Sequence, residues 1–158
     1  MSARPARILS GGQTGVDRAA LDAAVAAGVP YGGWCPAGGT AEDLPDGGLL
    51  TAYPHLRPTD SDDPAGRTRL NVRDSTAVLV VAPIHLVAGG TLLTVDEAGR
   101  LDRPCLVTTG PVARVVEWIE ALRVPCVLDV AGPRASEWPE GYDVARALLD
   151  EALRTTTL

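Results

Sequence analysis

The chain has 158 residues, 46% of them hydrophobic, and a formal net charge of −6 at pH 7. This length predicts one domain over residues 1–158 with a single core, and the hydrophobic content excludes a disordered chain. The acidic charge argues against a nucleic-acid partner, which needs a basic face, and no apolar run approaches the roughly 20 residues that cross a bilayer, so we expect no membrane contact.

The first predicted unit is a strand, a glycine-rich turn and a helix. An apolar run at residues 6–10 predicts the strand, and an alanine-rich pattern over residues 15–28 predicts the helix. Glycines let the backbone approach an anion closely, and the free N–H groups at the helix start point toward it. Neither the G-x-G-x-x-G fingerprint nor the G-x-x-x-x-G-K-[ST] loop is present, so the turn predicts an anion site without fixing its ligand.

The middle of the chain alternates between loop and regular structure. Residues 31–35 predict a short second strand, and the Gly-, Pro- and Asp-rich residues 36–64 predict a long loop, either functional or a tolerated insertion. A short helix is expected over residues 67–74. Residues 77–82 form the apolar, β-branched run typical of a strand buried on both faces, which leads to a second glycine turn at residues 89–91.

The last part of the chain predicts more strands and helices in alternation. A helical pattern follows the second glycine turn at residues 92–98. Strands are then expected over residues 105–107 and 125–130, and helices over residues 112–122 and 143–154.

This alternation predicts an α/β fold with a parallel sheet of about five strands and helices on both faces. The most economical strand order is 2-1-3-4-5, with the predicted strands numbered along the chain. In that order the first and third strands are neighbours, and the two glycine turns follow their carboxyl ends. Ligands of open α/β sheets bind at such a point, so the sequence predicts a site in the crevice between the two turns.

Several motifs, in order along nearly the whole chain, resemble the molybdenum-carrier (molybdenum cofactor carrier) family. This family is a branch of the Rossmann-like superfamily that includes the cytokinin-activating nucleotide phosphoribohydrolases. The motifs are S-G-G-Q-T-G-V-D-R (residues 10–18), G-G-W-C-P (32–36), A-E-D (41–43), Arg67 with N-V-R-D-S (71–75), G-G-T (89–91) with Leu93 and Thr94, P-C (104–105) and V-A-G-P-R (130–134).

The resemblance implies a Rossmann-like, doubly wound fold, a homo-oligomer (dimer or tetramer) and a small phosphorylated ligand that is pterin-like or nucleotide-like. For some members it implies molybdenum cofactor (molybdopterin) as the carried ligand. The phosphoribohydrolase relatives have a P-G-G-x-G-T loop with a Glu three residues after the Thr. Here Thr91 ends a shorter loop, and Thr94 stands three residues on.

The candidate ligand contacts come from the two glycine turns and from residues near the expected sheet ends. Threonine adds a hydroxyl donor, and an arginine fork binds phosphate in a bidentate way. Asp17 has a second interpretation as a helix-start acid or partner of Arg18, and Trp34 either stacks on a flat heterocycle or packs in the core. Arg134 is expected far from the crevice of its own subunit, where it serves structure or a neighbouring subunit. The candidates are Gly11, Gly12, Gln13, Thr14, Gly15, Asp17, Trp34, Arg73, Gly89, Gly90, Thr91, Thr94 and Arg134.

Two functions stay open at this point. The first is a binding or carrier protein that holds the phosphorylated ligand. The second is a nucleotide or nucleoside-phosphate hydrolase, in which an acid polarises a water molecule or stabilises positive charge on a ribose. The candidate acids are Glu42, Asp43, Asp96 and Glu97, and we expect this interpretation to require that one of them faces the crevice.

The sequence predicts neither a metal centre held by protein side chains nor a disulfide framework. His55 and His85 have no partner at a metal-ligand spacing. Cys35, Cys105 and Cys126 are odd in number and widely spaced, which fits a reducing compartment. Because the first residues also lack the apolar core of a signal peptide, we expect a cytoplasmic location.

Overall fold

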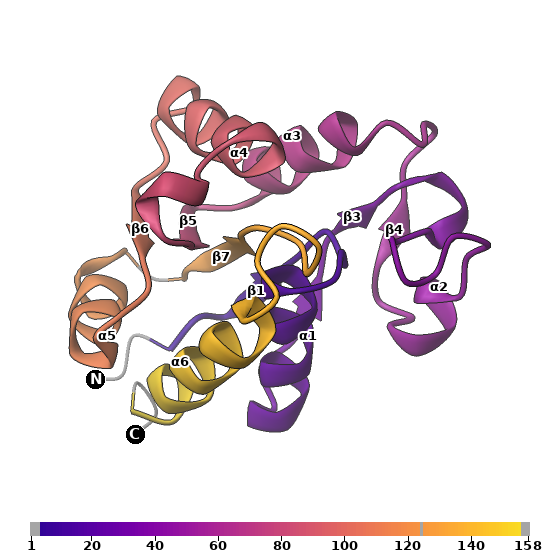
Figure 1. The fold of residues 1–158 in the computed structure, drawn as a ribbon. Helices are drawn as coiled ribbons and strands as arrows, with labels where there is room; N and C mark the ends of the chain where they lie inside the picture. The colour runs from indigo at the N-terminus through magenta and orange to yellow at the C-terminus, as the bar shows by residue number, and fades with distance from the viewer. Residues whose placement is uncertain (1–3, 124, 156–158) are drawn as a thin grey trace.

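The computed structural model describes residues 4–123 and 125–155 as a parallel sheet with helices on both faces (Figure 1). Within these residues the main sheet has five strands, which confirms the predicted α/β class. All neighbouring strands are parallel. In spatial order they are β2 (Tyr31–Gly32), β1 (Arg7–Leu9), β7 (Val127–Ala131), β5 (Ala77–Val81) and β6 (Cys105–Thr108).

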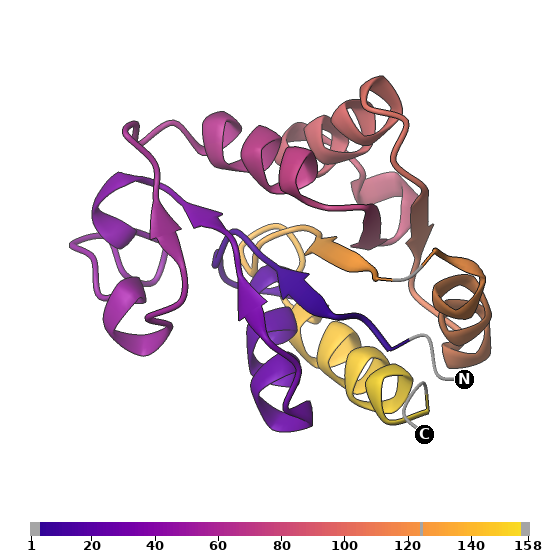
Figure 2. The same ribbon diagram turned by 180° about the vertical axis from the view of Figure 1, so that it is seen from behind.

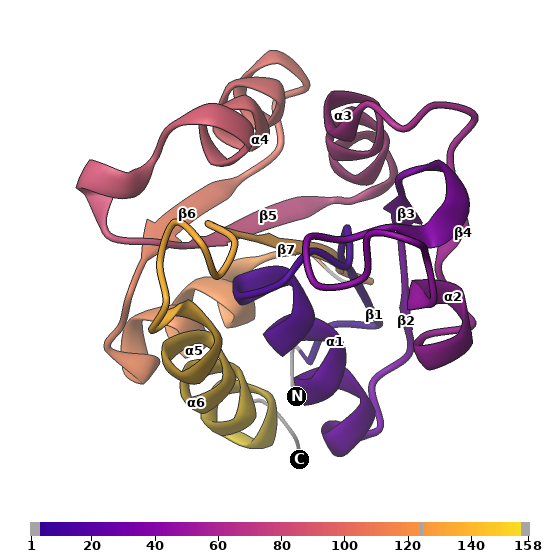
Figure 3. The same cartoon turned by 45° about the vertical axis from the view of Figure 1, so that its right-hand side comes forward.

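Two sets of helices bury the two faces of the sheet (Figure 3). One face packs against α1 (Val16–Ala27), α5 (Val112–Ala121) and α6 (Gly141–Thr155), and the other against α3 (Pro64–Asp74) and α4 (Gly89–Arg100). Side chains of a strand point alternately to opposite faces. Because helices cover both faces of the sheet, β5 is buried at every position. Leu79 and Val81 join the first layer, and Val78 and Val80 join the second.

The strand order differs from the predicted 2-1-3-4-5. The last strand, β7, lies between β1 and β5 in the centre of the sheet, whereas the prediction put it at the edge. Periodicity identifies strands but does not fix their neighbours. Because parallel crossovers are right-handed, the connection from β5 to β6 places α4 on one face, and the return from β6 to β7 places α5 on the other.

The predicted second strand is in fact two short strands. The chain turns at Gly33, whose φ of +126° suits glycine and whose missing side chain leaves room for the Ser10 carbonyl oxygen. β2 therefore ends at Gly32. The following β3 (Trp34–Cys35) leaves the main sheet and pairs in parallel with β4 (Arg57–Pro58), as seen in Figure 2.

The predicted loop over residues 36–64 contains more regular structure than its composition indicated. It includes the 3₁₀ turn η1 (Ala37–Gly39), the short helix α2 (Leu49–Ala52) and β4. Leu49 and Leu56 pack with Cys35 and with Leu21 of α1, so this segment has a small apolar cluster of its own. It is packed against the main body rather than extended from it.

The other predicted elements lie within a few residues of the observed ones. α3 begins three residues before the expected start, because the Asp63 side chain accepts a hydrogen bond from the Ala65 N–H at 3.0 Å and Pro64 suits the first turn. The 3₁₀ turn η2 (Ile84–Leu86) precedes α4, and α4 begins at Gly89 itself. The second pair of glycines therefore forms the first turn of a helix.

Over residues 4–123 and 125–155, none of the helices combines the length and the apolar character needed to cross a membrane.

Candidate functional site

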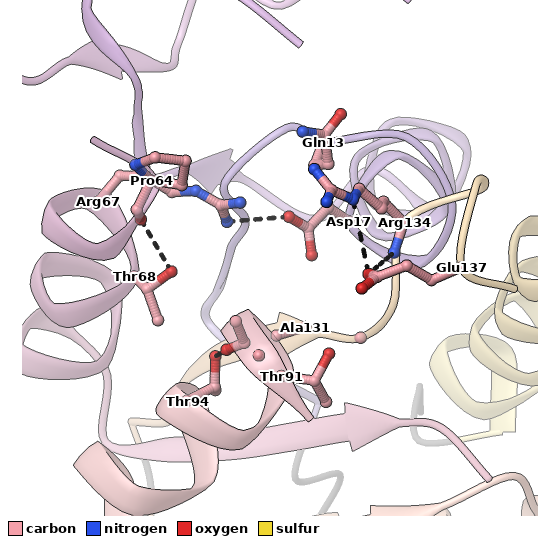
Figure 4. Close-up of a pocket in the computed structure, with 13 residues that line it drawn as sticks. Gln13, Asp17, Pro64, Arg67, Thr68, Thr91, Thr94, Ala131, Arg134 and Glu137 are labelled. Carbon is pink, nitrogen blue, oxygen red and sulfur yellow. Dashed lines mark hydrogen bonds and ion pairs between the residues drawn. The ribbon is translucent and has the colours of Figure 1, made fainter. Parts of the chain in front are cut away.

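A cavity of about 270 Å³ opens at the carboxyl ends of β1, β7 and β5, and we call it the central pocket (Figure 4). Its walls come from the β1–α1 loop, the starts of α3 and α4, and the β7–α6 loop. The lining residues are Gln13, Asp17, Pro64, Arg67, Thr68, Gly89, Gly90, Thr91, Thr94, Ala131, Gly132, Arg134 and Glu137. Both glycine-rich segments therefore contribute to one pocket, and β7 adds a third loop between them.

Asp17 lies in the first turn of α1 and faces the pocket (Figure 4). Its side chain is only 4% exposed, and its Oδ2 accepts a hydrogen bond from Nη1 of Arg67 at 3.1 Å. Burial raises the pKa of this carboxyl, while the charge of Arg67 and a hydrogen bond from the Gln13 backbone oppose the rise. The ion pair joins the start of α1 to the start of α3.

Arg67 is a central part of the site that the candidate set omitted. Its guanidinium lies against the backbone of Gly11, where a Cβ atom would come within 2.0 Å of Nη1. The Nε atom of Arg67 is buried and has no hydrogen-bond partner among the described residues. The sequence did contain a signal, because Arg67 is the first residue of the predicted helix that precedes the buried strand. Gly11 thus makes room for the arginine.

The first turn of α4 forms the opposite wall. Thr91 and Thr94 are buried, and the Thr94 hydroxyl donates to the Gly90 carbonyl oxygen at 3.1 Å. The N-cap residue is Ala88, which has no side chain able to cap the helix. The positive end of the helix dipole and the first N–H groups of α4 are therefore available to an anion in the pocket.

Arg134 lines the pocket of its own chain, in contrast to the expectation that it lies far from the crevice. The reason is the strand order: β7 is central, so the loop that follows it passes over the pocket (Figure 4). The Nε atom of Arg134 is 3.8 Å from Oε2 of Glu42 and 3.7 Å from Oε1 of Glu137. Both distances are long for an ion pair, so this guanidinium is only loosely held.

A hydrogen-bond network beside the pocket fastens the 36–64 segment to the β7–α6 loop. The Glu42 carboxylate accepts hydrogen bonds from the Thr14 hydroxyl, from the Ser136 N–H at 3.1 Å and from the Ser136 hydroxyl at 2.7 Å. The Gln13 Oε1 accepts from the Glu42 N–H at 2.9 Å. Partial burial would raise the pKa of Glu42, but these hydrogen bonds and the charge of Arg134 lower it below its usual value.

The other three candidate acids also lie outside the central pocket. Asp43 makes a bidentate pair with Arg18, with both N–O distances at 2.9 Å, and this hydrogen bonding lowers the pKa of the Asp43 carboxyl. Glu97 is buried and pairs with Arg100 at 2.6 Å, whose hydrogen bond lowers the Glu97 pKa. Asp96 is exposed. The acids that do line the pocket are Asp17 and Glu137.

Trp34 and Arg73 lie away from the central pocket. Trp34 lines a second cavity of about 140 Å³, where its Nε1 donates to Asp74 at 2.8 Å and the Arg57 guanidinium lies 5.7 Å from the ring centroid. Arg73 pairs with Asp74 at 2.8 Å near the end of α3. Of the candidates in the first glycine turn, Gln13 lines the central pocket, whereas Gly11, Gly12, Thr14 and Gly15 form the loop behind it.

A second acidic side chain lies close to the ion pair of Asp17 and Arg67. Asp129 in β7 is 3% exposed, and burial and the charge of Asp17 raise its pKa to about 8, against the opposing effect of Arg67. Sequence reasoning missed this residue, although a lone carboxyl within the apolar run of residues 125–130 was a visible signal.

The described residues contain no group of three or more His, Cys, Asp or Glu side chains placed to hold a metal ion. His55 stacks on Tyr31, with ring centroids 4.9 Å apart, and His85 is exposed in η2.

Comparisons with known proteins identify a family and a solved structure that this chain resembles. The family model described as "Circularly permutated YpsA SLOG family" matches residues 8–153. The crystal structure of the "Putative molybdenum carrier protein" from Syntrophus aciditrophicus SB superposes with a TM-score of 0.83. The two sequences are 35% identical, and the match covers 97% of each chain. No curated protein matches the chain.

Proposed function

Because the chain belongs to the circularly permuted YpsA SLOG family, we propose that it binds a small phosphate-bearing ligand of the pterin or nucleotide class in the central pocket. The observation that carries this proposal is the meeting of the uncapped start of α4 with two arginines, Arg67 and Arg134, around one cavity. Helix N-termini and guanidinium forks are both groups that proteins use to bind phosphate.

The charges of the pocket support an anionic ligand despite the acidic chain. The chain contains no lysine, so every side-chain cation other than histidine is an arginine, the residue suited to bidentate phosphate contacts. Arg134 is shared between Glu42 and Glu137 at 3.7–3.8 Å, and a phosphate can replace these weak contacts with closer ones. Gly89 and Gly90, whose N–H groups stand at the start of α4, line the same pocket.

Molybdenum cofactor, a phosphate-bearing pterin, is the first ligand to test, since the Syntrophus relative is named for molybdenum carriage. The pocket residues fit such a cargo: the start of α4 and Arg134 would hold the phosphate, and Asp17 and Gln13 would face the amino and amide groups of the pterin. The cavity of about 270 Å³ is near the lower end of the range for small-molecule sites, and it suits a ligand that is partly exposed.

The hydrolase alternative receives less support from the geometry. The four acids considered for it, Glu42, Asp43, Asp96 and Glu97, lie outside the central pocket, and three of them are held in hydrogen bonds or ion pairs. The binding function therefore accounts for the arrangement with fewer assumptions.

Native mass spectrometry of the purified protein, followed by denaturing extraction, tests the proposal. A co-purified pterin phosphate or nucleotide supports it, and the mass of the native species shows whether the protein is a dimer or tetramer. Isothermal titration calorimetry with molybdenum cofactor and with adenosine 5′-monophosphate then measures affinity. The proposal fails if nothing co-purifies and neither compound binds at millimolar concentration.

A further inference from the structure

Asp129 lies at the middle of the central strand, on the side of the sheet that faces α3 and α4. In the register of the sheet it is paired with Leu9 of β1 and Val78 of β5. Its neighbours Leu128 and Val130 pack into the layer of α1, α5 and α6. Because strand side chains alternate, the Asp129 carboxyl is directed to the opposite layer, beneath the central pocket.

The surroundings of this carboxyl contain one cation and two other groups that titrate. Asp17 from α1 and Arg67 from α3 act on it electrostatically, and Asp129 in turn acts on the Cys105 thiol of β6. β1 and β5 contribute the apolar side chains of Leu9 and Val78. Within the described chain, the Asp129 carboxyl makes no hydrogen bond.

One guanidinium therefore faces two buried carboxyl groups. Asp17 is the one in direct contact with Arg67, at 3.1 Å, so the ion pair is complete without Asp129. An unpaired carboxylate in a buried site is strongly unfavourable, and such a group keeps its proton instead. The raised pKa of Asp129, at about 8, has this cause. At neutral pH the three side chains together carry no net charge, and at alkaline pH they carry one negative charge.

We propose that Asp129 is a positioning residue of the central pocket: it holds a proton that keeps the group of Asp129, Asp17 and Arg67 electrically neutral beneath a bound anion. This inference rests on the proposed anion-binding function and specifies how that function depends on protons. When Asp129 ionises, its charge competes with the ligand for Arg67 and repels an anion in the pocket above. Binding of the anion is consequently coupled to proton uptake at Asp129.

Calorimetric titration across pH tests the coupling. The probes are sulfate and adenosine 5′-monophosphate, because their own charges are constant above about pH 7.5. Between about pH 7.5 and about pH 9.5 we expect the wild-type Kd to rise roughly 20-fold, in proportion to the loss of the Asp129 proton. In Asp129→Asn, whose side chain is always neutral, Kd stays within about twofold. The control Cys105→Ser removes the neighbouring thiol, leaves Asp17 in place and keeps the wild-type profile.

A second measurement needs no variant. Calorimetry of the wild-type protein in buffers of different ionisation enthalpy counts protons, and we expect close to one proton taken up per ligand at about pH 9. A Kd that is flat with pH in the wild type, or equally steep in Asp129→Asn, overturns this inference and leaves the proposed function standing. Failure of both probes to bind at any pH overturns this inference, and the proposed function falls with it only if nothing co-purifies and molybdenum cofactor also fails to bind.

Discussion

The Arg67 guanidinium and the Asp17 carboxylate lie 3.1 Å apart, and this contact joins two helix starts that are 50 residues apart in the sequence. It also fixes one wall of the central pocket, since both side chains line the cavity. The side chain of Arg67 is 15% exposed and that of Asp17 is 4% exposed, so the pair is shielded from solvent. Removal of one partner leaves the other charge without compensation in a buried site.

We therefore expect Arg67→Met to lower the free energy of unfolding by about 3 kcal/mol or more, because it leaves the buried Asp17 carboxylate unpaired. The same change should weaken binding of adenosine 5′-monophosphate at least about tenfold, since it removes a pocket cation. Urea denaturation and calorimetry measure the two effects.

Arg73→Ala is the matched control for Arg67→Met. Arg73 belongs to the same helix but lies near its other end, where it pairs with Asp74 at the surface with a side chain 57% exposed. We expect its loss to change stability by less than about 1 kcal/mol and to leave binding unchanged. Equal losses in the two variants would contradict the assignment of Arg67 to the pocket.

Gly90→Ala tests whether Gly90 contacts the ligand or is needed only for the fold. A Cβ atom at Gly90 would meet nothing within 4 Å, so the unbound protein should tolerate the change. A phosphate at the start of α4 would meet the new methyl group, and we expect Kd for adenosine 5′-monophosphate to rise about tenfold or more. Calorimetry measures the change in Kd, and thermal melting checks that the fold is kept.

Gly99→Ala provides the comparison for Gly90→Ala within α4. A Cβ at Gly99 is equally free of neighbours, but this residue lies near the other end of the helix. Because alanine favours a helix over glycine, we expect a gain of up to about 1 kcal/mol and no change in Kd. If Gly90→Ala binds as well as Gly99→Ala, the ligand does not approach the start of α4.

The site could be predicted in part because glycine-rich segments at strand ends have local signals. Gly89, Gly90 and Thr91 were identified this way, and they line the pocket. Arg67 lies at the site because α3 packs on the sheet. Asp129 lies beneath it because β7 is in the centre of the sheet. Hydrophobic periodicity reports which residues are buried in a strand, but not which strand lies beside it. The same limit explains why Arg134 was placed far from the crevice.

The split of the second predicted strand shows a related limit. The apolar character of residues 31–35 is continuous, and only the turn at Gly33 separates β2 from β3. We predicted one strand over residues 31–35, because neither Gly32 nor Gly33 shows in the sequence that the chain leaves the main sheet. The partner strand β4 is two residues long and contains Pro58, which gave no strand signal.

Trp34→Phe tests whether the second cavity belongs to the ligand site. Trp34 donates from Nε1 to Asp74 and lies under Arg57, away from the central pocket. We expect the phenylalanine variant to bind adenosine 5′-monophosphate within about twofold of the wild type, with a stability loss of about 1 kcal/mol from the lost hydrogen bond. A loss of affinity beyond about tenfold would instead favour stacking of the ligand on Trp34.

Glu42→Ala should loosen the attachment of the 36–64 segment. Its carboxylate accepts from Thr14 and Ser136, which belong to loops of the main body. We expect amide hydrogen exchange in this segment to speed up about tenfold, which corresponds to roughly 1.4 kcal/mol of opening free energy. Asp46→Ala removes an exposed acid from the same segment and serves as the control. Unchanged exchange in Glu42→Ala would mean that the other contacts, such as the Asp43–Arg18 pair and the apolar cluster, hold the segment without Glu42.

Asp129→Asn should change the pH dependence of stability in a direction that the raised pKa fixes. The Asp129 pKa is 3.8 as the reference value and about 8 in the folded protein, so between these values the folded state binds a proton that the unfolded state has released. The contribution of Asp129 to stability consequently falls as the pH rises through this window, by up to about 1.4 kcal/mol per pH unit, and levels off above about pH 8. Asparagine does not titrate. The free energy of unfolding of the variant, relative to that of the wild type, should therefore rise from about pH 5 to about pH 8.

Urea denaturation of both proteins at several pH values measures this difference, with Asp46→Asn as the acid-to-amide control at an exposed position. A difference that grows with pH shows that Asp129 holds its proton in the folded state without any ligand. A difference that is constant from about pH 5 to about pH 8 would mean that Asp129 is ionised throughout, with Arg67 shared between two carboxylates. The pocket floor would then carry a negative charge at neutral pH, and the coupling of anion binding to protons would lose its basis.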